Sequence, residues 1–134
     1  MLSEFKKYNN MTKRKLILGV DFDGTVCDHN FPAIGEPLPN AFEVLKEFME
    51  AGDRLILWTC REGIFLQEAI SFCKQNGVVF EKHNENVPEH DYSKSRKIYC
   101  DLYIDDRMAG GFPGWLFVRE QVKEIRKKFS NYSF

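Results

Sequence analysis

Short apolar runs that alternate with amphipathic stretches are the feature that most constrains the fold of this chain. Runs at residues 15–21, 54–59 and 101–105 have the length and apolar character of buried strands. Apolar residues recur at helical spacing after Asn40 and again over residues 62–76. Strands that alternate with helices predict a mostly parallel sheet with helices on both of its faces.

Two further apolar runs complete the predicted sheet. Residues 78–80 form a short strand candidate, and residues 115–118 form another. A last helix is predicted over residues 120–128, with a basic face that is most simply a solvated surface. The predicted fold class is therefore α/β: a Rossmann-like three-layer sandwich with a mostly parallel five-stranded sheet.

Turn-forming residues predict where the helices begin and end. Asn40 is predicted to cap the first helix, with Glu43 in the reciprocal capping position. Gly52 and Gly77 follow the first and second helices and are predicted to end them.

Length and composition exclude several classes of protein. The 134 residues, 43% of them hydrophobic and 29% charged, suit one soluble domain after a polar, flexible extension at residues 1–12. The net charge of −1 creates no overall field toward nucleic acid or an anionic membrane. The apolar run before Asp21 is too short to span a bilayer, and Asp21 and Asp23 interrupt any signal peptide, so a cytoplasmic location is predicted.

Polar residues follow three of the predicted strands. Asp21 and Asp23 lie at the end of the strand predicted at residues 15–21, and Thr59 ends the strand at residues 54–59. Asp105 and Asp106 lie at the end of the strand at residues 101–105. In parallel α/β sheets, ligands bind beyond the carboxyl ends of the strands. Carboxylates gathered at one such edge repel one another unless a cation neutralises them, and hard oxygen ligands of this kind select Mg²⁺.

These segments resemble the motifs of the haloacid dehalogenase (HAD) superfamily. The first motif corresponds to Asp21-Phe22-Asp23-Gly24-Thr25-Val26, after an apolar strand. The second, third and fourth correspond to Leu57-Trp58-Thr59, to Lys97 and to Ile104-Asp105-Asp106. The resemblance covers residues 15–118 and implies a single HAD-like catalytic domain at residues 13–134.

The resemblance implies a magnesium-dependent phosphatase. Asp21 would be the covalent nucleophile, and Asp23 would be the general acid and base that acts on the leaving alcohol and then on water. The metal ligands would be the Asp21 carboxylate, the backbone carbonyl of Asp23 and the Asp105 carboxylate, while Asp106 would orient a metal-bound water.

The resemblance also implies a set of phosphate-binding residues. Thr59 would donate a hydrogen bond to a phosphoryl oxygen, and Lys97 would neutralise charge on the transferring group. Lys94 competes with Lys97 for this role because it lies only three residues earlier. Gly24 would allow a sharp turn that leaves backbone N–H groups free to face phosphate.

Two arginines follow the second and fourth motifs directly. Arg61 and Arg107 either reach the pocket and bind a second anionic group of the substrate, or pair with the local carboxylates. The sequence leaves both interpretations open.

The intervals between the motifs have no room for a cap domain, so a capless member of the superfamily is predicted. An open site of this kind suits a phosphorylated small molecule or polymer terminus, or a site covered by a second copy in a homo-oligomer. The loop at residues 27–39 is the candidate for a partial lid. No membrane partner is expected, and nucleic acid is expected only as a substrate.

Three alternatives to hydrolysis are open. The chain could be a phosphotransferase, an aspartyl-phosphate signalling module, or a phosphate-binding protein without turnover. Receiver domains of signalling proteins combine similar residues, but their acidic pair precedes the phosphoacceptor, which is the reverse of the order here. Asp23 also favours hydrolysis, because it can activate water against an aspartyl-phosphate.

Overall fold

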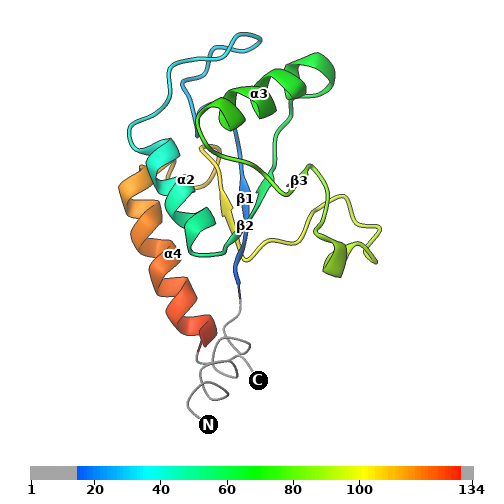
Figure 1. Cartoon of the computed structure of the whole chain (residues 1–134), viewed down its shortest axis with the longest axis vertical. Helices are drawn as coiled ribbons and strands as arrows, with labels where there is room; N and C mark the ends of the chain where they lie inside the picture. Colours follow the sequence, from blue (N-terminus) through cyan, green and yellow to red (C-terminus); the bar gives the residue numbers. More distant parts are fainter. Residues whose placement is uncertain (1–14, 131–134) are drawn as a thin grey trace.

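A parallel four-stranded sheet forms the centre of the molecule (Figure 1). The structure is a computed structural model that describes residues 15–130, so the predicted extension at residues 1–12 lies outside the described residues. The strands have the order β3-β2-β1-β4; their bounds are β1 Ile17–Val20, β2 Arg54–Leu57, β3 Lys82–His83 and β4 Leu102–Ile104. The predicted α/β class and parallel pairing are confirmed, but the sheet has four strands rather than five.

The two surplus strand predictions fail for different reasons. At residues 78–80, the Val78 N–H donates to the Cys73 carbonyl at 2.9 Å and so closes the end of the preceding helix. Hydrogen bonding to β2 begins at Glu81, whose N–H donates to the Leu55 carbonyl at 2.8 Å, and β3 starts at Lys82. Residues 115–118 instead begin the helix α4, Trp115–Ser130. Its buried residues Trp115, Val118 and Val122 have helical spacing, which a four-residue apolar window conceals.

The remaining helices are close to their predicted positions. They are α2, Ala41–Glu50, and α3, Gly63–Gln75, and a short 3₁₀ helix, η1, spans Pro88–His90. The predicted capping box is absent: Asn40 precedes α2 at φ 66°, and its side chain donates to the Glu43 carboxylate rather than to the helix backbone. Among the described residues, no helix is long and apolar enough to cross a membrane.

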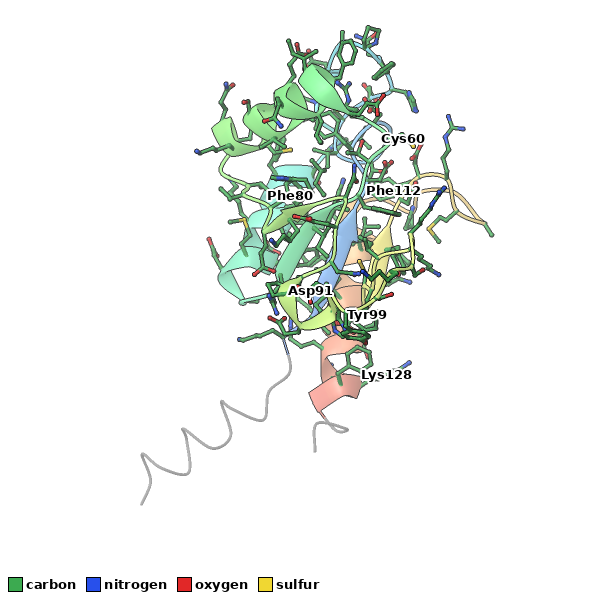
Figure 2. The ribbon with its side chains drawn as sticks, turned by 90° about the vertical axis from the view of Figure 1, so that its right-hand side faces the viewer. Cys60, Phe80, Asp91, Tyr99, Phe112 and Lys128 are labelled. Carbon is green, nitrogen blue, oxygen red and sulfur yellow. The ribbon has the colours of Figure 1, made fainter. Side chains whose placement is uncertain are left out.

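The two faces of the sheet are covered differently, which corrects the predicted three-layer sandwich. Residues of α2, α3 and α4 pack on the face that carries Leu18, Val20 and Leu57. The opposite face, with Ile17 and Ile56, is covered by segment 84–100, which contains no α-helix. The buried residues of this segment are Val87, Ile98 and Cys100. Figure 2 shows this segment in front of the strands, with Asp91 and Tyr99 labelled on it.

The order of the strands explains why segment 84–100 lies on the second face. The chain passes from β3 at one edge to β4 at the other, and a right-handed crossover in this direction runs over the face opposite α2 and α3. The segment contains two Asn, two Ser and Pro88 and lacks a helical apolar period, so it crosses without forming an α-helix.

Gly19 in β1 allows this segment to approach the sheet closely. A Cβ atom at Gly19 would lie 2.6 Å from the Cys100 Sγ, well inside van der Waals contact. The Cys100 side chain therefore occupies the space that a larger residue at position 19 would need.

We expect Gly19→Ala to lower the free energy of unfolding by about 1–3 kcal/mol, because the added methyl group overpacks the second face. Urea unfolding of both proteins measures the loss. In a Cys100→Ala background the same substitution should cost less, since the clashing sulfur is gone. An equal cost in the two backgrounds would contradict this account.

Candidate metal and phosphate site

Three carboxylates meet at the carboxyl edge of the sheet. Asp21 follows β1, and Asp105 and Asp106 follow β4; these strands are parallel neighbours, with Val20 in register with Ile104. One carboxylate oxygen from each of the three aspartates lies within 4.8 Å of those of the other two. Of the four carboxylates predicted at this edge, these three gather. We call them the acidic cluster.

The hydroxyl of Thr25 links two members of the acidic cluster. Its Oγ1 donates to Asp21 Oδ2 at 3.0 Å and lies 3.4 Å from Asp106 Oδ1. Thr25 is fully buried, and its carbonyl accepts a 2.7 Å hydrogen bond from the Trp115 indole N–H at the start of α4. Thr25 and Trp115 therefore support the acidic cluster, a role that the sequence analysis did not assign to either residue.

Gly24 is required at its position for the predicted turn and for a second, steric reason. It adopts φ +85°, which confirms the sharp turn. Its N–H is not free to face phosphate, because it donates to the Cys27 carbonyl at 2.8 Å. A Cβ atom here would lie 2.2 Å from Asp106 Oδ2, so the absence of a side chain is what lets Asp106 approach.

Burial and like charge shift the protonation of the acidic cluster. Burial raises the pKa of Asp21 from 3.8 to about 8, and the hydrogen bond with Asp106 and the charge of Asp105 act in the same direction. For Asp106, burial acts to raise the pKa, but hydrogen bonds from Asp21, from its own backbone and from Thr25 outweigh it and lower the pKa. Without a cation, burial and the neighbouring carboxylates thus favour the protonated form of Asp21.

Asp23 lies outside the acidic cluster and pairs with Arg61. The Arg61 Nε donates to Asp23 Oδ2 at 2.8 Å, and Nη2 donates to Oδ1 at 2.7 Å. Of the two interpretations of Arg61, pairing with a local carboxylate is the one that the structure contains. The Asp23 carbonyl as a metal ligand stays a prediction.

Thr59 lies at the same edge, where β2 ends. Its Oγ1 accepts a hydrogen bond from the Arg61 backbone N–H at 3.1 Å, and its own N–H donates to Asn84 Oδ1 at 2.8 Å. Asn84 follows β3 at φ 56° and was missed by the sequence analysis. The available signal was a polar residue directly after an edge strand. The sequence predicts that strand at residues 78–80 instead of at β3, so Asn84 does not directly follow the predicted strand.

The predicted cations do not contact the acidic cluster. The Lys97 Nζ lies 5.2 Å from the centroid of the Tyr103 ring, on the second face of the sheet. Within residues 15–130, neither Lys97 nor Lys94 forms an ion pair with the acidic cluster, and both side chains are exposed. Arg107 is also exposed, and only its backbone N–H reaches the cluster, by donating to Asp105 Oδ1 at 2.9 Å.

The fold and the site together define an α/β protein with an acidic cluster at the carboxyl edge of a parallel sheet. Figure 2 labels Cys60, which follows Thr59, near this end of the molecule and Tyr99 toward the other end. No protein-family model matches the sequence, and no curated protein matches it.

Among solved structures, the chain is similar to a conserved protein from Bacteroides thetaiotaomicron. The two are 45% identical with a TM-score of 0.78, over 83% of this chain and 92% of that one. The chain therefore belongs to the same family as this conserved Bacteroides protein.

The raised pKa of Asp21 predicts how stability depends on pH in the presence of a chelator. Between its ordinary pKa of 3.8 and about 8, Asp21 binds more protons in the folded than in the unfolded chain, so stability should fall as pH rises through this window. Urea unfolding at a series of pH values measures the decline. Asp21→Asn should flatten it, whereas Asp91→Asn, at an exposed position, should not; equal slopes for wild type and Asp21→Asn would refute the prediction.

Proposed function

We propose that the protein is a magnesium-dependent phosphomonoesterase of the HAD type, with Asp21 as nucleophile and Asp23 as general acid and base. The observation that carries this proposal is the acidic cluster, in which Asp21 is held beside Asp105 and Asp106 by the pairing of β1 with β4. The position of Asp23 two residues beyond Asp21, at the same edge, supports it.

The acidic cluster fits a hard divalent cation. Its donors are all carboxylate oxygens. Burial, with the Asp106 hydrogen bond and the Asp105 charge, raises the pKa of Asp21 to about 8, so the charged form of Asp21 is disfavoured unless a cation offsets its charge. Asp21, Asp105 and Asp106 would hold the ion, and the Asp23 carbonyl would complete the set by the family resemblance. Bound there, Mg²⁺ would offset the repulsion between the nucleophilic carboxylate and the phosphate.

The chain's own residues account for the first half-reaction. The Thr25 hydroxyl holds Asp21 Oδ2 and so fixes the orientation of the nucleophile. An Asp21 oxygen forms a bond to phosphorus while the bond between phosphorus and the ester oxygen breaks. Protonated Asp23 gives its proton to the departing oxygen, which leaves as an alcohol, and the carboxylate that remains is the form that pairs with Arg61.

The second half-reaction returns the enzyme to its starting state. Asp23, now a carboxylate, takes a proton from water, and the water oxygen attacks the phosphorus of the aspartyl-phosphate. The bond between phosphorus and the Asp21 oxygen breaks, and inorganic phosphate leaves. Thr59, at the end of the neighbouring strand, has a hydroxyl proton to donate to a phosphoryl oxygen.

Asp21→Asn should abolish the magnesium-dependent hydrolysis of phenyl phosphate, because an amide cannot form the intermediate. Asp23→Asn should lower kcat by about 100-fold or more. Asp91→Asn, on the exposed segment distant from the site, should retain the wild-type rate. Phosphate release measured for the four proteins checks this, and equal rates for wild type and Asp21→Asn would exclude the mechanism. A stable phosphoryl adduct without repeated turnover would indicate a signalling module instead.

Cation binding can be tested apart from turnover. Asp105→Asn should weaken Mg²⁺ or Mn²⁺ binding by at least about tenfold, because it removes one charged oxygen donor from the acidic cluster. Isothermal titration calorimetry measures both affinities, with Asp91→Asn as the matched control. Equal affinity in wild type and Asp105→Asn would show that the ion binds elsewhere.

A further inference from the structure

The guanidinium of Arg61 is buried and fully hydrogen-bonded. The residue is 2% exposed. Besides its two bonds to Asp23, Nη2 donates to the Ala33 carbonyl at 2.8 Å, and Nη1 donates to the carbonyls of Pro32 at 3.2 Å and Phe65 at 3.4 Å. An arginine has five side-chain N–H donors, so every one is occupied.

Aromatic rings enclose the same group. The Arg61 Cζ lies 5.1 Å from the ring centroids of both Phe22 and Phe31. Phe31 in turn packs edge-on against Phe65 of α3, with the ring centroids 5.4 Å apart. A guanidinium with no free donor, and with rings beside it, cannot also bind an anionic group of a substrate.

The partners of Arg61 come from three separate parts of the chain. Asp23 follows β1, Pro32 and Ala33 belong to the loop 27–39, and Phe65 belongs to the first turn of α3. Asp23 is the only anion among them, so removing the guanidinium would leave a carboxylate and three carbonyls without these donors. The loop and Asp23 are therefore held by one side chain.

We propose that Arg61 is a positioning residue that fixes Asp23 and the loop 27–39 in a single arrangement beside the acidic cluster. The proposal rests on the function proposed above, in which Asp23 protonates the leaving group. The bidentate bond sets the orientation of the Asp23 carboxylate, and the carbonyl contacts couple that orientation to the loop. Lysine cannot replace this function, because its single ammonium lacks the planar fork.

Leaving-group dependence tests the link to Asp23. Phenyl phosphate needs a proton on its departing oxygen, whereas p-nitrophenyl phosphate releases a stabilised phenolate and needs it far less. We expect Arg61→Lys to lower kcat/KM for phenyl phosphate about tenfold more than for p-nitrophenyl phosphate. Added to Asp23→Asn, it should cause no further selective loss, because Arg61 acts through Asp23. Equal losses on both esters, additive with Asp23→Asn, would overturn the proposal.

Arg54→Lys is the matched control. Arg54 lies on β2 and bridges Glu81 and Glu89, away from the acidic cluster, so its substitution should leave the ratio of the two rates unchanged. Urea unfolding establishes that each variant is folded under assay conditions. If Arg61→Lys is unfolded, Arg61→Gln, which keeps an amide donor, replaces it in the same assays.

Hydrogen exchange tests the loop coupling independently of turnover. The amides of Asp28 and Leu38 close the base of the loop by donating to the carbonyls of Glu36 and Val26. Arg61→Lys should accelerate exchange at both amides, and Arg54→Lys should not. If wild type shows no Asp21-dependent hydrolysis, the proposed function fails, and exchange alone then decides whether Arg61 holds the loop. Unchanged exchange in Arg61→Lys would refute the coupling.

Discussion

The parallel pairing of β1 with β4 is the constraint on which the site depends. It fixes Asp21 beside Asp105 and Asp106, and in doing so gathers negative charge where water cannot fully screen it. Two neighbouring residues accommodate this arrangement. The Thr25 hydroxyl donates a hydrogen bond to the acidic cluster, and Gly24, which has no side chain, leaves the space that Asp106 occupies. A bound cation would offset the remaining negative charge. The electrostatics and the proposed chemistry therefore concern the same carboxylate oxygens of the acidic cluster.

The helical layer also contributes to the site, through Trp115. Its indole N–H binds the Thr25 carbonyl, so the first turn of α4 fixes the backbone from which the Thr25 hydroxyl reaches Asp21. Trp115 is buried within the same core as the residues of β1 and α2. Packing of the helices and orientation of the nucleophile are thus not separable, and a core substitution near Trp115 would alter both.

Residues whose roles follow from strand order were predictable from the sequence, and those whose roles follow from side-chain contacts were not. Asp21 and Asp105 follow apolar runs, and parallel pairing brings such ends together. The bond between Arg61 and Asp23 joins residues 38 apart, and only the packed loop shows which of two interpretations is correct. The strand predicted at residues 115–118 fails because four apolar residues cannot distinguish a strand from the first turn of a helix. The predicted third layer fails because strand order specifies that the chain must cross the second face, but not that it crosses as a helix.

The unequal covering of the sheet has a consequence for Lys97. Among residues 15–130, twenty buried residues form one core on the helical face, whereas five form the cluster on the face that segment 84–100 covers. Lifting this segment from the sheet would therefore expose little apolar surface and leave the larger core intact, as in a local unfolding unit of low free energy. Lys97, which now lies over Tyr103, belongs to this segment. The lysine that the family resemblance assigns to the phosphate is thus carried by a segment whose displacement would expose less apolar surface than displacement of the helical layer.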